Sequence, residues 1–433
     1  MLRAFITAFK IPDLRRKLLF TLAIIAVYRI GAWVPIPGID VDLVREAPAG
    51  AGAAGNIVSI INVFAGGALQ QMAVFALGIM PYITASIIMQ LLAVVIPKLE
   101  ALRREGEQGR KKITQYTRYV TVGLSLLQST ALVTLARNGK MFNGLNVMPE
   151  AGTGTIVIAV LTLTAGTSLI MWLGELITAR GVGNGMSLLI YVSIISQFPS
   201  QLRIVQVEAS GGIAGGWGLV AGVLLMGMVL TVAVVFIEMG QRRIPVQYAR
   251  RQVGRRSYGG QSTYIPLKVN QSGVIPVIFA SSLMYLPGLA ASVSGSQAFV
   301  NWTEQYLGQA DNAVFIGIFA ALTIFFAYFY SAITFNPVEV ADNMKRYGGF
   351  IPGIRPGRQT AEYLDKVLTR ITLPGSLYLA TIAVIPFILL AVFNIGAFPL
   401  GGVSLLIMVG VALQTMQQIE SQLMQRNYEG FLR

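Results

Sequence analysis

The chain has 433 residues, of which 54% are hydrophobic and only 12% are charged. A soluble globular protein carries about twice that charged fraction, so the composition excludes an ordinary soluble protein. There is no cysteine and no histidine, which excludes disulfides, Ser-His or Cys-His catalysis and the usual zinc ligands. The net charge of +14 is typical of a membrane protein whose cytoplasmic loops collect Lys and Arg.

Apolar stretches of about 20 residues, long enough to cross a bilayer as helices, recur along the whole chain. We therefore predict an all-α polytopic membrane protein with ten transmembrane helices and no separate soluble domain. The predicted spans, with bounds good to a few residues, lie at about 18–35, 72–96, 117–136, 154–174, 186–205, 217–238, 272–291, 313–335, 373–393 and 402–420.

An even number of spans places both termini on one side of the membrane. Nearly all of the 33 Lys and Arg fall on that side, in the N-terminus, the loops after the even-numbered spans and the C-terminal tail. By the positive-inside rule this side is cytoplasmic. The basic residues 10–17 before the first apolar run resemble a signal peptide. Arg29 and Trp33 follow in place of a small-residue cleavage site, so we expect the first helix to be retained.

The ten spans divide into two sets of five. Because five is an odd number, the two sets have opposite orientations in the membrane, as in inverted repeats. We predict an N-terminal half at 1–205 and a pseudo-symmetric C-terminal half at 206–433.

Residues 57–71 are apolar but too few to cross the membrane, and Gly66 and Gly67 interrupt them. In a channel such a segment is a re-entrant half-helix, which requires protein or water around it. Alternatively, it is an interfacial helix that lies on the membrane surface. The residues alone leave both interpretations open.

Two long cytoplasmic loops, between spans six and seven and between spans eight and nine, are dense in arginine. Topology and contact with anionic lipid are one explanation for these charges. Topology needs few charges, so the density favours docking of an acidic or phosphate-rich partner, such as a ribosome or a motor protein. The arginines predicted to dock are Arg242, Arg243, Arg250, Arg251, Arg255, Arg256, Arg355 and Arg358.

Carboxylates are nearly absent from the predicted spans, with Glu175 and Glu238 at cytoplasmic span ends. An ion-coupled transporter usually keeps an acidic group near the midplane, which counts against that class. A secondary transporter of small solutes remains the alternative, because some uncoupled carriers need no such group. The chain has no Walker A motif, so any energy source must be a partner. We predict no enzymatic activity, no cofactor and no metal site.

Six sequence stretches carry a family resemblance. They are NVFAGGAL (62–69), GIMPYITAS (78–86), GVGNGMS (181–187), the arginine-rich 242–256, PLKVN (266–270) and IPGIRPGR (351–358). In this order, and over essentially the whole chain, they resemble the SecY family, the central subunits of the bacterial Sec protein translocon.

The resemblance implies an hourglass of ten helices that is closed by a plug and opens sideways to lipid. The plug is expected at 57–71, including Asn62, Phe64, Gly66 and Gly67. The lateral gate is expected between spans two and three on one side and seven and eight on the other. The polar residues assigned to the gate are Gln90, Gln128, Asn270, Ser281 and Ser282; without the resemblance, ordinary helix packing explains such residues.

The resemblance also implies a central constriction lined by apolar side chains. Carried over motif by motif, it falls on Ile79, Ile83, Met186, Ile190, Ile278 and Ile407. The spacing of four within each of the first two pairs places each pair on one helix face, although ordinary packing also produces such pairs. Met186 departs from the isoleucine that we expect; because methionine is apolar but more flexible, the seal should hold.

By this resemblance the function is that of a protein-conducting channel in the cytoplasmic (inner) membrane. It passes unfolded secretory polypeptides and releases transmembrane segments sideways into lipid. The implied partners are the SecE and SecG subunits, the SecA ATPase, ribosomes, signal sequences, nascent polypeptides and membrane lipids, with no direct DNA binding.

Overall fold

The computed structural model describes residues 9–46, 62, 64–139, 145–149, 152–210, 217–248, 251–253, 256–258, 262–294, 296–307, 312–393 and 401–431. Ten of its helices each overlap one predicted span. They are α2 (Pro12–Gly31), α5 (Met80–Val95), α7 (Glu107–Arg137), α8 (Thr153–Arg180), α9 (Gly185–Ser210), α10 (Trp217–Glu238), α11 (Ile275–Ser294), α13 (Ala313–Thr334), α15 (Arg358–Phe393) and α16 (Gly402–Phe431).

Six helices within the described residues are long and apolar enough to cross a membrane. The number rises to seven if α5 and α6 (Pro97–Arg104), which meet at a bend of 98°, count as one span. The chain is therefore a helical membrane protein, and the number of ten spans stays a prediction. The predicted boundary between halves at 205 falls inside α9, which continues to Ser210.

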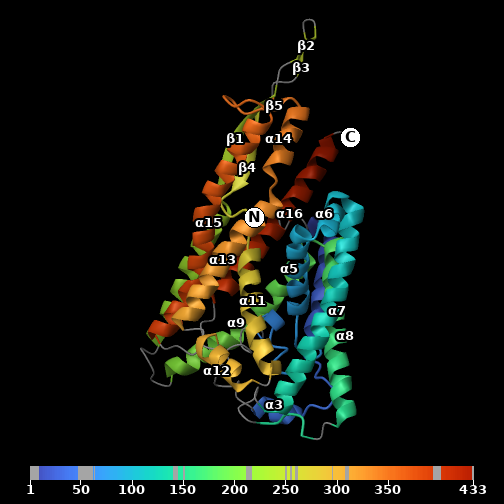
Figure 1. Ribbon diagram of the computed structural model, residues 1–433, viewed down its shortest axis with the longest axis vertical. Coiled ribbons are helices and arrows are strands. Elements are labelled where there is room, and N and C mark those ends of the chain that lie inside the picture. Colours follow the sequence, from blue (N-terminus) through green and yellow to red (C-terminus); the bar gives the residue numbers. More distant parts are fainter. Residues whose placement is uncertain are drawn as a thin grey trace.

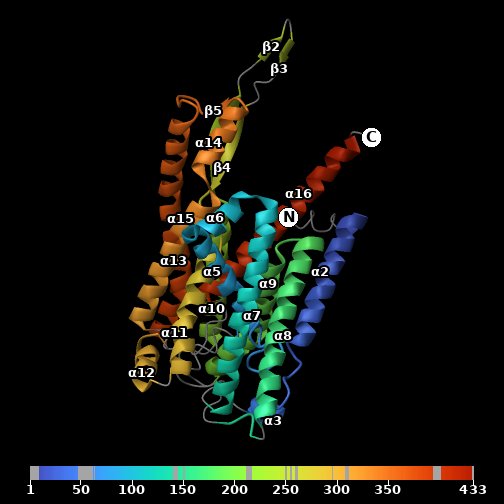
Figure 2. The same cartoon turned by 45° about the vertical axis from the view of Figure 1, so that its right-hand side comes forward.

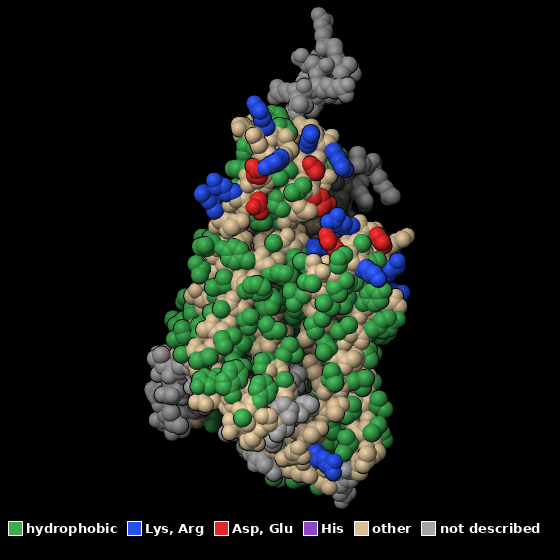
Figure 3. Space-filling model, in the orientation of Figure 1, with side chains coloured by type: hydrophobic (Ala, Val, Ile, Leu, Met, Phe, Trp, Pro, Cys, Tyr) green, Lys and Arg blue, Asp and Glu red, His purple; other side chains and the backbone are tan. Residues whose placement is uncertain are grey.

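The long helices lie side by side in a bundle with two different ends (Figure 1). The strands and α14 (Pro337–Arg346) lie at one end, and the short helices α3 (Val41–Glu46) and α12 (Gln297–Tyr306) lie at the other. Apolar side chains cover the middle of the face in Figure 3, whereas most charged side chains gather at the end that carries the strands. This distribution fits a middle that lies in lipid and charged ends that lie outside it; that the end with the strands is cytoplasmic stays a prediction.

One large apolar core joins both halves of the chain. In the N-terminal half α7 packs between α5 and α8, and α2 packs against α8 (Figure 2). In the C-terminal half α13 packs between α11 and α15. The halves meet where α11 contacts α5 and α7, and where α9 contacts α10 and α16.

The prediction that span two is helical from residue 72 is wrong at its start. Helix α5 begins only at Met80, and residues 66–79 form consecutive turns. A bridge between Pro35 and Ala73 ties these turns to the chain after α2, so backbone pairing replaces helical hydrogen bonds. Glycine favours the left-handed conformations found here. The positive φ values belong to Gly66 (63°), Gly67 (89°), Met72 (44°) and Gly78 (56°).

The prediction of an all-α chain holds for the spans but not for the two long arginine-rich loops. The first loop forms β1 (Gln241–Tyr248) and β4 (Ser262–Lys268), which pair with each other. On its other edge β1 pairs with β5 (Gly349–Phe350) of the second loop, so the strand order is β4-β1-β5. Beyond them β2 (Arg251–Val253) pairs with β3 (Arg256–Tyr258). Ile244 and Val246 of β1 are buried while their neighbours are exposed, the alternation of a strand with one covered face.

The sheet has a small apolar core of its own, separate from the core of the bundle. Ile244 and Val246 of β1 pack there with Leu267 of β4, Met344 of α14 and Leu364 of α15. The two long loops therefore form one folded unit, which we call the cytoplasmic double loop after the side of the membrane predicted for it (241–268 and 337–367, as far as described).

Candidate functional site

The six predicted ring residues belong to or pack against one large apolar core, although they come from both halves: Ile79 precedes α5, and the others lie on α5, α9, α11 and α16. Five of them are at most 8% exposed, and Met186 is partly buried at the edge of the cluster. The five buried residues are Ile79, Ile83, Ile190, Ile278 and Ile407. The structure thus places all six in or against the core shared by the halves, on helices of which α5 contacts α11 and α9 contacts α16; that they meet in a constriction stays a prediction.

The GIMPYITAS stretch positions the first two ring residues. Gly78 has a φ of 56°, and a Cβ on it would lie 3.1 Å from Cα of Ala65, so only glycine fits this turn without strain. Pro81 in the first turn of α5 favours helix initiation. Ile79 and Ile83 are consequently held at the start of α5.

The GVGNGMS stretch positions Met186 at the start of α9. Gly183 has a φ of 85°, and a Cβ on Gly185 would lie only 2.0 Å from the carbonyl oxygen of Gly174 in α8. The side-chain oxygen of Asn184 accepts the backbone N–H of Met186 at 3.1 Å, as an N-cap does. A Cβ on Gly174 would lie 2.4 Å from Sδ of Met186, so this side chain packs closely against α8.

The predicted plug is described only in part, and residues 57–61 and 63 lie outside the described residues. Asn62 and Phe64 are 4% and 3% exposed. The carbonyl oxygen of Asn62 accepts the N–H of Gly67 at 3.1 Å, and its side-chain oxygen accepts the N–H of Gln70 at 3.2 Å. Protein therefore surrounds Asn62 and Phe64, as a re-entrant segment requires, while Gln70 is exposed; that the segment is a plug stays a prediction.

Polar groups predicted at the gate lie on helices that contact one another. Gln90 is on α5, Gln128 on α7, and Ser281 and Ser282 are on α11, which contacts both of the other helices. Oε1 of Gln90, Nε2 of Gln128 and Oγ of Ser282 are buried and have no hydrogen-bond partner among the described residues. Unpaired buried groups destabilise the packed state, so the packing of these three helices bears that cost.

Asn270 is not on any of these helices but in the short segment between β4 and α11. Its side-chain NH₂ donates to a carboxylate oxygen of Glu238 at the end of α10 and to the carbonyl oxygen of Gly273. Asn270 therefore joins the end of α10 to the segment before α11. Its assignment to the gate stays a prediction.

The described docking arginines share the cytoplasmic double loop. Arg242 and Arg243 are exposed on β1, and the Arg243 guanidinium lies 4.8 Å from the ring centre of Tyr264. Arg355 is exposed, whereas Arg358 donates to Glu362 at 2.8 Å. Arg251 and Arg256 belong to the paired strands β2 and β3; Arg250 and Arg255 lie outside the described residues.

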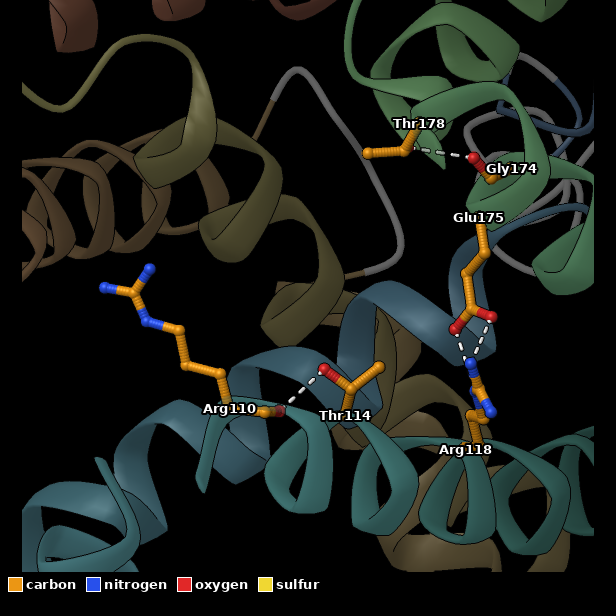
Figure 4. Close-up of polar contacts among 6 residues, drawn as sticks. All are labelled: Arg110, Thr114, Arg118, Gly174, Glu175 and Thr178. Atoms are coloured by element: carbon orange, nitrogen blue, oxygen red, sulfur yellow. Dashed lines mark hydrogen bonds and ion pairs between the residues drawn. The ribbon is translucent and has the colours of Figure 1, made fainter. Parts of the chain in front are cut away.

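The sequence did not predict the ion pair that joins α7 and α8. Figure 4 shows the Arg118 guanidinium reaching both carboxylate oxygens of Glu175, at 2.9 and 2.6 Å, while Arg110 points away. The pair borders a groove of about 400 Å³ that Trp172 and Leu176 also line. Arg118 lies inside a predicted span, and a charged group there implies a partner, but no sequence pattern identifies Glu175 as that partner.

Comparisons with known proteins agree with this architecture. The chain matches the SecY family over residues 73–416. It is 58% identical to protein translocase subunit SecY of Streptomyces coelicolor and 55% identical to that of Mycobacterium tuberculosis, each over 100% of both chains.

Solved structures share the fold at 16% sequence identity. One is described as the structure of a protein conducting channel, with a TM-score of 0.66, covering 94% of this chain and 91% of that chain. Another is Sec61 in the canine ribosome-channel complex, with a TM-score of 0.61 and the same coverage. From its sequence and its fold, the chain belongs to the SecY family.

Proposed function

We propose that this chain is the channel subunit of a protein translocase. It passes unfolded secretory polypeptides across the cytoplasmic membrane and releases transmembrane segments sideways into lipid. The observation that carries the proposal is that the six predicted ring residues, which come from both halves, belong to or pack against one apolar core, on helices whose α5–α11 and α9–α16 contacts join the halves. Full-length relatives at 55–58% identity are named protein translocase subunits.

An aliphatic ring suits a channel for polypeptides of any sequence. It has no groups that replace the water shell of an ion, so a narrow ring excludes ions by dewetting. It also forms no hydrogen bonds that would retain a particular side chain. The buried residues around Phe64 add a second barrier when no polypeptide is present.

Sideways release requires that one contact between the halves opens. The contact of α11 with α5 and α7 is suited to this, because these three helices carry the buried, unpaired polar groups of Gln90, Gln128 and Ser282. Water or a passing backbone satisfies such groups when the helices separate, which reduces the cost of opening. A departing segment gains about 0.3–0.6 kcal/mol for each Leu or Ile that reaches lipid.

The cytoplasmic double loop is the proposed docking site for a ribosome or the SecA ATPase, and the SecE and SecG subunits complete the complex in the membrane. Exposed Arg242, Arg243 and Arg355 present guanidinium groups that bind phosphate or carboxylate in a fork. Two solved structures with this fold are of Sec61 and Ssh1 in complexes with ribosomes, which supports a ribosome as a partner.

A secondary transporter of small solutes is the competing function. Its binding site would need polar groups at the midplane where the halves meet. In this chain the six predicted positions at that place are aliphatic or methionine, which favours the channel.

Proteoliposomes that contain the chain with its two small subunits test the proposal. With SecA and ATP added, a secretory precursor should become protected from external protease, whereas the same precursor without its signal sequence should not. Absence of protection in vesicles whose SecA still hydrolyses ATP on binding, together with uptake of small solutes, would favour the transporter.

A further inference from the structure

Arg29 occupies an unusual position near the end of α2. It is partly buried, and no ion pair within the described part of the chain includes it. Its Nη1 instead donates to the carbonyl oxygen of Gly66 at 3.1 Å and to Oγ of Ser196 in α9 at 2.8 Å. A partly buried charge that only neutral acceptors satisfy is costly to keep in a span, which points to a specific task.

Both acceptors belong to a tightly packed junction. We call residues 64–70 the double-glycine turn, after Gly66 and Gly67. A Cβ on Gly66 would lie 3.0 Å from Nη1 of Arg29 and 3.0 Å from Cα of Ser193, and one on Gly67 would lie 2.3 Å from Nε2 of Gln197. Both glycines have positive φ. The turn is thus pressed onto α9 in a conformation that a side chain would prevent.

The double-glycine turn also packs in the apolar core that contains the predicted ring. Ala65, Ala68 and Leu69 are 0% exposed and lie in the same cluster as the predicted ring. The chain continues from this turn to Ile79 and the start of α5. Displacing the turn from α9 would therefore unpack part of this core.

We propose that Arg29 is a positioning residue that fastens the double-glycine turn to α9 and so keeps the central cluster closed to water and ions when no polypeptide is present. This inference deepens the proposed channel function and rests on it. One guanidinium binds α2, the turn and α9 together, because it donates to the turn and to Ser196 while Ser196 Oγ lies 3.4 Å from the same Gly66 carbonyl.

A single cysteine reports the position of the turn, since the chain has none of its own. In an Ala68→Cys background, reconstituted complexes are treated with a membrane-impermeant maleimide in the absence of substrate, and ion current is recorded in parallel. Arg29→Met should raise the modification rate and the current about tenfold or more, the effect of losing one charged hydrogen bond. Arg203→Met, which removes an exposed positive charge from the same α9, should leave both unchanged.

Two milder variants keep the test decisive if Arg29→Met folds poorly. Ser196→Ala removes one acceptor and should raise modification about two- to tenfold, and Arg29→Lys should give an intermediate value because an ammonium lacks the guanidinium fork. In the double variant Arg29→Met with Ser196→Ala the second change should add little. Unchanged modification and current in all of these variants, or full additivity in the double one, would overturn the proposal.

The same vesicles separate this inference from the proposed function. Wild-type complexes that protect a secretory precursor, combined with Arg29 variants that neither label nor leak more, refute the positioning role alone. Increased labelling in the variants, combined with a wild type that never protects a precursor, retains the positioning role and refutes the channel.

Discussion

The aliphatic side chains at the predicted constriction differ in their surroundings. Ile407 is fully enclosed at 0% exposed and Met186 packs closely against Gly174, whereas Ile83 and Ile278 are 8% and 7% exposed. The last two come from opposite halves of the chain. Their helices, α5 and α11, contact each other, so these two side chains are the ones chosen for substitution.

We predict that Ile83→Gly and Ile278→Gly each raise the ion conductance of reconstituted channels, and that the double variant raises it further. Removing the side chains lets water enter, and a wetted constriction no longer excludes ions. Ile170→Gly in α8 is the matched control, because Ile170 is 0% exposed in the same core cluster but outside the predicted ring. Equal conductance in the ring variants, the control and the wild type would remove both isoleucines from the constriction.

The Arg118–Glu175 pair gives a second prediction for single residues. A double-mutant cycle with Arg118→Met and Glu175→Gln, measured by thermal unfolding in detergent, should show a coupling of about 0.5–1 kcal/mol, because both side chains remain partly exposed. The control is Arg104 with Glu100, an exposed pair within α6, whose coupling should be at most about 0.5 kcal/mol. No difference between the two cycles would show that the pair adds nothing to the packing of α7 on α8.

Motifs with turn chemistry were more informative than isolated polar residues. The glycines of GIMPYITAS and GVGNGMS mark tight turns in the structure, and Asn184 acts as the N-cap that such a residue can provide. The hydrogen-bond partners of Asn270 and Arg118 were not predicted, because Glu238 and Glu175 are distant from them in sequence. Local pattern cannot identify a partner that only tertiary packing supplies.

At the scale of elements, hydrophobicity predicted where the helices are better than where they begin. The apolar residues 72–79 read as part of a span, yet they form turns because backbone pairing with the chain after α2 satisfies them. The sheet was missed for a related reason. The arginines of residues 241–268 led to an interpretation based on charge alone. Apolar Ile244 and Val246 alternate there with other residue types, which is the pattern of the strand that the structure shows.

The pairing of β1 with β5 makes a docking prediction for the cytoplasmic double loop. Gln247 faces Phe350 and Tyr248 faces Gly349, so the segment that carries Arg355 begins beside the first loop. We expect Arg355→Lys to weaken ribosome or SecA binding and to lower export, although the charge is kept, because lysine cannot form bidentate contacts. Binding affinity, export of a precursor and topology by protease protection are measured on the same variant.

Arg346→Lys provides the control for that experiment, because Arg346 ends α14 in the same double loop, is exposed and is outside the predicted docking set. It should bind and export normally. Normal affinity and export in Arg355→Lys as well would leave these arginines as topology signals, for which any positive charge suffices.

At the scale of the whole molecule, two halves share one core but meet through contacts of different character. In one contact α9 packs against α10 and α16. In the other α11 packs against α5 and α7, and these three helices carry the unpaired polar groups of Gln90, Gln128 and Ser282. The outer surface agrees with a lipid environment, since Leu225, Met228 and Phe236 of α10 are 67%, 71% and 80% exposed. Sequence predicted the order of the helices, but the contacts between halves required the structure.

The path of a translocating polypeptide tests the channel most directly. The substrate is a secretory precursor with one cysteine, arrested by a fused domain that cannot unfold. Complexes carry either Ile83→Cys or Leu225→Cys as their single cysteine, since the chain has none of its own, and are treated with an oxidant. We predict a disulfide between the precursor and Ile83→Cys and none with the lipid-facing Leu225→Cys. An arrested precursor that links to Leu225→Cys as readily as to Ile83→Cys, or that links to neither, would contradict passage through the centre of this chain.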